Sequence, residues 1–128
     1  MPLSAKVRDR CRAYLKPGEE IRYVFPGTSV RIGDLPGMVP FLVVVTDGGI
    51  AVLGCSDRFR KHRPNSVFDR LPRDTRLGPV DIDGSLGPTV DVGGVLLEID
   101  EEYIPVIRAA DLELAGGANL PQDPLPEL

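Results

Sequence analysis

Residues 41–55 constrain the fold more than any other part of this chain, because they hold two apolar runs joined by Asp47-Gly48. Asp and Gly tolerate the positive φ angles of a tight type I′ turn, so the stretch predicts a β-hairpin. The register that this turn sets pairs Thr46 with Gly49, Val45 with Ile50, Val44 with Ala51, Val43 with Val52 and Leu42 with Leu53.

Both faces of this hairpin are apolar, since successive side chains of a strand point to opposite faces. An antiparallel hairpin at a surface usually keeps one polar face, so each face here needs a cover. We expect the protein core to cover one face and an N-terminal helix to cover the other. A second copy of the chain is the alternative cover for that second face.

Residues 1–16 predict the amphipathic helix that this arrangement needs. Apolar residues recur there at helical spacing: Leu3, Val7, Cys11, Tyr14 and Leu15. Ser4 is suited to cap the helix, and Pro17-Gly18 to end it. A helix of about a dozen residues is marginal alone, so its apolar stripe should dock on the hairpin.

The strands before the hairpin are predicted from alternation. Residues 20–25 should form a strand with Ile21, Tyr23 and Phe25 on one face. Residues 26–40 contain three Pro and three Gly, which predicts a long irregular connection with a short extended piece at 29–32.

The remaining elements follow the hairpin. We expect short strands at 66–71 and 75–80, a second hairpin of 89–92 and 95–99 turned at Gly93-Gly94, and a helix over 100–115. Pro105 lacks an amide hydrogen and fits only a first turn, so regular helix should begin near Tyr103. Residues 116–128 predict a Pro-rich extended tail.

The size of the chain, 128 residues, is that of one domain with a core of its own. Cys11 and Cys55 lie in apolar surroundings without metal-ligand spacing, which favours two small buried hydrophobes. The N-terminus has no signal-type apolar segment, and no run approaches the roughly 20 apolar residues of a membrane span. We expect a cytosolic protein.

Charge is unevenly distributed along the chain, whose net charge is −4. Residues 1–16 carry five basic residues against one acid, and residues 57–76 carry seven against three. From Leu77 onward there are eleven acids and one base, Arg108. Such asymmetry indicates either an anionic partner for the basic side, or internal complementarity and solubility.

Residue types that would carry catalysis are sparse. His62 is the single histidine, and neither convergent metal ligands nor a partner that would orient its imidazole can be pointed to. Serine-elbow and paired-carboxylate patterns are also missing. We therefore expect no enzyme, no metal and no cofactor.

The order of predicted elements, with certain short motifs, resembles the bacterial pleckstrin-homology-like (PH-like, GRAM-like) domains. The motifs are Leu15-Lys-Pro-Gly-Glu-Glu-Ile21, Leu42-Val-Val-Val-Thr46-Asp47, Leu71-Pro72 and Ala110-Asp111. The family's usual Arg after Thr-Asp is Gly48 here. The resemblance implies an α+β, mainly β fold: a split barrel of bent antiparallel strands over 17–115, plugged by the C-terminal helix. It also implies binding rather than catalysis.

Function is accordingly expected to be binding. We predict a protein-protein interaction or scaffold module; a domain that docks on anionic lipid headgroups is the alternative. The partner-binding residues should be the basic cluster Arg58, Arg60, Lys61 and Arg63, on a loop after the hairpin. We expect an acidic protein partner and no nucleic acid, and a homodimer stays open.

Overall fold

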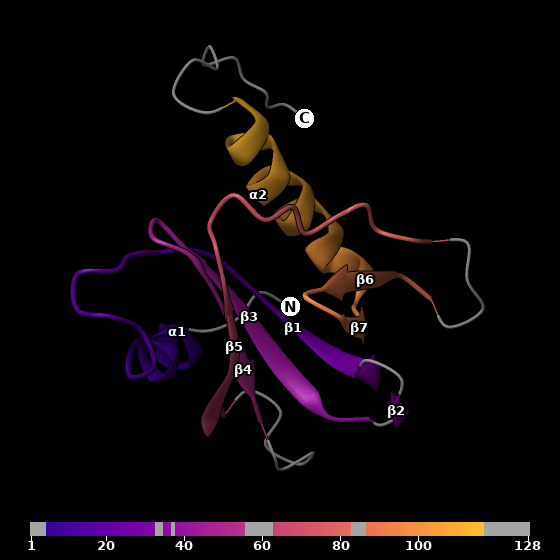
Figure 1. Ribbon diagram of the computed structural model, residues 1–128, viewed down its shortest axis with the longest axis horizontal. Helices are drawn as coiled ribbons and strands as arrows, with labels where there is room; N and C mark the ends of the chain where they lie inside the picture. Colours follow the sequence, from indigo (N-terminus) through magenta and orange to yellow (C-terminus); the bar gives the residue numbers. More distant parts are fainter. Residues whose placement is uncertain (1–4, 33–34, 37, 56–62, 83–86, 117–128) are drawn as a thin grey trace.

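A computed structural model describes residues 5–32, 35–36, 38–55, 63–82 and 87–116 (Figure 1). Its elements are α1 (Ala5–Arg12), β1 (Ile21–Ile32), β2 (Leu35–Pro36), β3 (Pro40–Thr46), β4 (Ile50–Gly54), β5 (Ser66–Leu71), β6 (Thr89–Val92), β7 (Val95–Glu98), the 3₁₀ turn η1 (Glu101–Tyr103) and α2 (Ile104–Gly116). One antiparallel sheet runs in the order β5-β4-β3-β1-β7-β6, and β2 pairs with β1. The expected α+β, mainly β fold is confirmed at this level.

The central hairpin is the expected one. Strands β3 and β4 pair with Val45 opposite Ile50 and Val43 opposite Val52, which confirms the predicted register. Every residue of both strands is buried. The hairpin therefore lies inside the protein, and neither of its faces is exposed to solvent.

The tip of this hairpin differs from the expected type I′ turn. Neither Asp47 nor Gly48 has a positive φ angle. Instead, the Thr46 hydroxyl oxygen accepts the amide hydrogens of Gly48 and Gly49, at 3.1 and 3.0 Å. Because a side-chain oxygen satisfies both amides, the turn closes without left-handed residues.

The tip is also tied to the residues that precede β1. The Thr46 hydroxyl donates to the Glu19 carboxylate at 2.8 Å. The Asp47 carboxylate accepts the Glu20 amide at 3.1 Å. Burial alone would raise the pKa of Glu19, but the hydrogen bonds from the Lys16 amide and the Thr46 hydroxyl, with the charges of Arg70 and Lys16, together lower that pKa.

The two faces of the sheet carry separate apolar cores, covered by different helices (Figure 1). On one face, Val7 and Cys11 of α1 pack with a cluster that includes Leu42, Val44 and Leu53. This confirms the N-terminal helix as the second cover. The helix ends at Arg12, earlier than Pro17-Gly18 predicted.

The other face carries the larger core, and α2 covers it. Tyr103, Ile107 and Ala110 pack there against residues of β1, β3, β4, β6 and β7. Regular helix begins at Ile104, with Pro105 in the first turn as expected.

Cys11 and Cys55 are both buried free thiols in the α1 core, as expected. Burial raises the pKa of each thiol to about 11. At neutral pH both are therefore protonated and behave as small hydrophobes.

Strand β1 is longer than predicted, which corrects the expected long loop from Pro26 to Pro40. Its first part pairs with β3 from Ile21 to Thr28, and its last part pairs with β7 from Thr28 to Ile32. At Pro26, β1 pairs with β3 only, and its other edge is free. A proline is tolerated there because it has no amide hydrogen to donate to a second strand.

An irregularity in β1 also changes one predicted face. The register with β3 shifts between Ile21 and Tyr23. Tyr23 and Phe25 face the α2 core, whereas Ile21 packs against the α1 core. The prediction that Ile21 shares their face is wrong, because an extra residue in a strand reverses the side to which its neighbours point.

The elements after the hairpin agree with prediction except at residues 75–80. Strand β5 has the predicted bounds, and β6 and β7 turn at Gly93 and Gly94, both with positive φ. Residues 75–80 do not form the predicted strand. The Leu77 and Gly78 amides instead donate to the Asp111 carboxylate on α2, at 2.9 and 2.8 Å.

A second carboxylate clamps α2 onto the sheet. Glu113 accepts hydrogen bonds from Arg22 of β1 and from Arg73, which follows β5. Burial alone would raise the pKa of Glu113, but the hydrogen bonds and charges of the two arginines together lower it. The ionised carboxylate therefore stabilises the fold.

The outer strands β5 and β6 converge at one end of the curved sheet. A Cβ added to Gly93, in the β6–β7 turn, would lie 3.1 Å from a methyl carbon of Leu71 in β5. The sheet is thus a curved half-barrel in which the β6–β7 turn approaches the end of β5.

Val44→Asp should unfold the protein. Val44 is fully buried in the α1 core, so the change loses about 1.5 to 3 kcal/mol of apolar burial and adds the desolvation of a carboxylate. Total stability is only about 5 to 15 kcal/mol. Circular dichroism melting checks this, with Val67→Asp on the exposed part of β5 as control. A cooperative melt of Val44→Asp near the wild-type temperature would contradict the two-cover arrangement.

Glu113→Gln should destabilise the protein by about 1 to 2 kcal/mol at pH 7. The folded pKa of Glu113 is lowered, so its contribution is complete above the unfolded value of about 4.3 and is lost as pH falls through the folded pKa. The gap between wild type and variant should therefore shrink below about pH 4.3. Urea unfolding at several pH values measures it, with Glu101→Gln as control. A gap independent of pH would refute the clamp.

Candidate functional site

One end of the sheet gathers the exposed and chemically varied residues. The strand registers align a row across it: Glu98 lies opposite Thr28, Thr28 opposite Pro40, Phe41 opposite Gly54, and Gly54 opposite Ser66. We call this the loop end of the sheet, defined by Thr28, Pro40, Gly54, Ser66 and Glu98. It is the end away from the hairpin tip that Glu19 and Glu20 hold.

One member of the predicted basic cluster, Arg63, lies at this end. Arg63 is exposed, and its amide donates a hydrogen bond to the sulfur of Cys55, which directly follows β4. Nearby, the Asn65 amide donates to the Gly54 carbonyl at 2.8 Å. Arg58, Arg60 and Lys61 lie outside the described residues. The role of all four in binding stays a prediction.

Strand β5 adds exposed apolar side chains beside Arg63. It is the last strand on its side of the sheet, and Val67 and Phe68 are 41% and 46% exposed. The Phe68 ring meets the buried Phe41 ring edge-on, with 5.3 Å between centroids. Phe68 therefore has a fixed base and an open outer side, which suits contact with a partner.

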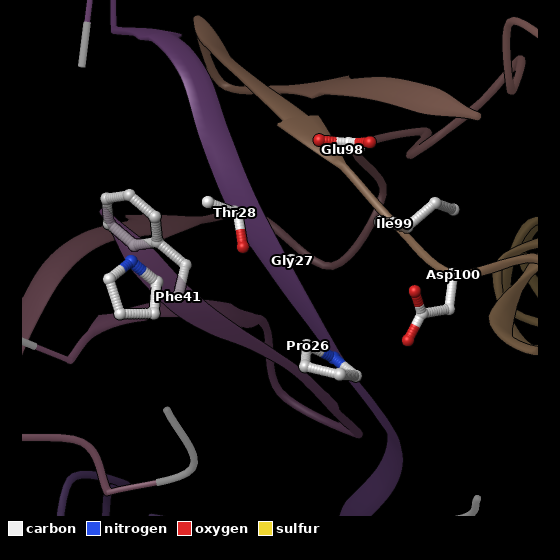
Figure 2. A pocket seen from close by; sticks show the side chains of 8 residues that line it. Pro26, Gly27, Thr28, Phe41, Glu98, Ile99 and Asp100 are labelled. Atoms are coloured by element: carbon white, nitrogen blue, oxygen red, sulfur yellow. The ribbon is translucent and has the colours of Figure 1, made fainter. Parts of the chain in front are cut away.

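A pocket of about 210 Å³ lies at the acidic part of the loop end (Figure 2). It is lined by Pro26, Gly27, Thr28, Pro40, Phe41, Glu98, Ile99 and Asp100. Figure 2 shows Phe41 on one side of β1, and Glu98, Ile99 and Asp100 on the other.

The close approach of β7 to Gly27 shapes this pocket. A Cβ added there would lie 3.1 Å from the Leu97 Cβ and 3.4 Å from a methyl carbon of Ile99. Glycine thus lets the two strands meet where the pocket forms.

The acidic side of the pocket comes from two alternate residues. Ile99 points into the α2 core, so its neighbours Glu98 and Asp100 lie on the other face. Asp100 precedes η1 but makes no capping hydrogen bond with its side chain. Asp100 is also exposed, so its carboxylate is accessible to a ligand.

Searches against protein-family models, curated proteins and solved structures found no match for this chain. Among the helices in the described ranges, none is long and apolar enough to cross a membrane. Within the same ranges, no group of three or more His, Cys, Asp or Glu residues is placed to hold a metal ion.

Sequence reasoning proposed Arg63, whose role stays a prediction, and did not predict the pocket or the aromatic pair. Phe41 and Phe68 are far apart in the chain and meet only through the β3–β4–β5 pairing. Glu98 and Asp100 do leave a local signal, since two acids flank a buried residue at the end of a strand. That Thr28 faces them depends on β1 extending past Pro26.

Phe68→Ala should cost about 1 to 3 kcal/mol, because about half of the side chain is buried and the edge-on ring pair adds about 0.5 to 1.5 kcal/mol beyond burial. Phe41→Ala should cost about 3 to 5 kcal/mol, because Phe41 is buried in the α2 core. Denaturant unfolding of both variants measures the difference. Equal losses would show that Phe68 serves the core rather than the surface.

Proposed function

We propose that this chain is a non-catalytic, cytosolic protein-interaction module of the pleckstrin-homology-like type, which binds an acidic segment of a partner protein at the loop end. The observation that carries the proposal is the exposed Val67 and Phe68 on an outer strand, next to exposed Arg63. Apolar area supplies affinity for a protein surface, and a neighbouring cation selects acidic partners.

The family part of the proposal is supported by the contacts of the motif residues. They pair across the fold: Glu19 with Thr46, Asp47 with Glu20, and Asp111 with Leu77 and Gly78. A curved antiparallel sheet with its last helix packed on the inner core also agrees with the split barrel that the resemblance implies.

A protein partner is favoured over a lipid surface on energetic grounds. Each basic residue near an anionic membrane contributes about 1 kcal/mol, so the four residues of the predicted cluster would supply about 4 kcal/mol, or millimolar binding. The pocket at the same end carries Glu98 and Asp100, which such a membrane would repel. Exposed apolar residues and mixed charge fit a protein surface better.

Site-specific photo-crosslinking in the native cytosol tests the proposal. A photoreactive phenylalanine analogue at Phe68 should give discrete protein adducts, whereas the same analogue at Leu112, equally exposed on α2, should not. Changing Arg58, Arg60, Lys61 and Arg63 to Glu should reduce the adducts at least about tenfold, since each lost charge pair costs up to about 1 kcal/mol.

Two results would overturn the protein-partner assignment. One is equal labelling from positions 68 and 112. The other is robust co-flotation with vesicles rich in anionic lipid at physiological salt, lost on the fourfold change to Glu, which would establish the lipid alternative.

A further inference from the structure

We propose that the pocket beside Thr28 receives one arginine side chain of the partner. This inference rests on the proposed function and specifies the chemistry of the bound segment. It concerns the acidic part of the loop end, whereas the proposed function concerns the basic and apolar part around Arg63 and Phe68.

The size of the pocket limits what can enter. Its volume, about 210 Å³, is below the roughly 300 to 1,000 Å³ of sites that enclose whole small-molecule ligands. A single long side chain therefore fits it.

The lining of the pocket selects a cation with an apolar stem. Glu98 and Asp100 supply two carboxylates, and Thr28 opposite Glu98 supplies a hydroxyl. Pro26 and Pro40 add apolar ring surface against which methylene groups can pack. The planar guanidinium presents several donors in fixed directions, so it can bind a carboxylate through two parallel hydrogen bonds, which an ammonium cannot do.

The pocket adjoins the exposed apolar side chains of β5. Phe41 lines the pocket, and its ring meets the Phe68 ring with 5.3 Å between centroids. The bound segment should thus carry its arginine close to an apolar residue, so that one enters the pocket while the other packs on Phe68.

Binding of N-acetyl-arginine amide to the full chain tests the pocket directly, followed by NMR of the backbone amides. We expect saturable shifts confined to Thr28, Glu98, Asp100 and their neighbours. N-acetyl-citrulline amide, which has the same shape without the charge, should bind at least about tenfold more weakly.

Matched variants assign any binding to the two carboxylates. Glu98→Gln with Asp100→Asn should weaken arginine binding about tenfold or more, and Asp100→Asn alone by less. Asp100 is exposed, so the single variant stays informative if the double variant fails to fold. Glu20→Gln, an exposed carboxylate at the opposite end of the sheet, should leave binding unchanged.

Equal shifts with the citrulline compound, shifts that do not saturate, or retained binding in Asp100→Asn and the double variant would overturn the inference. Its failure is separable from failure of the proposed function. If arginine does not bind while position 68 still gives adducts, the pocket inference alone is wrong. If arginine binds while position 68 gives none, the pocket stands and the proposed partner site is wrong.

Discussion

The structure depends on burying both faces of the β3–β4 hairpin. All seven residues of β3 are buried, so exposing either face to water would lose a large part of the free energy of apolar burial. One face requires a large core, supplied by β6, β7 and α2, and the other requires α1. A helix of eight residues is too short to be stable by itself, so α1 and the hairpin stabilise each other.

The sequence pattern predicted those parts of the fold that depend on residues close together in the chain. The β3–β4 register follows from alternation, and the Gly93-Gly94 turn from backbone freedom. Prediction failed where a distant partner decides the outcome. Hydrogen bonds of the Thr46 hydroxyl shape the hairpin tip, for which Asp47-Gly48 predicted a type I′ turn. Pairing with β7 keeps β1 extended beyond Pro26. The Asp111 carboxylate binds the amides of residues 77 and 78, so these residues do not form a strand. The pocket needs the β1–β3 and β1–β7 pairings at once, so the sequence alone did not predict it.

The motif residues that carry the family resemblance act as clamps. Glu19 and Asp47 join the hairpin tip to the start of β1, and Asp111 joins α2 to the segment after β5. Each clamp is a carboxylate that accepts hydrogen bonds from backbone amides or a hydroxyl. A single residue of this kind can hold together two elements that are distant in the sequence. Such residues bear on the stability of the fold rather than on a ligand. The short motifs therefore leave the binding residues open.

The clamps and the candidate site lie at opposite ends of the sheet, and this separation bears on how the protein could acquire its specificity. At the tip end, Glu19 and Glu113 hold elements that are distant in sequence, so substitution there changes stability first. At the loop end, Arg63, Phe68 and Asp100 are exposed, and their substitution removes little buried surface. Residues at the loop end can therefore be substituted at little cost in stability while the double-sided core stays constant, which is what the proposed binding function requires of this end.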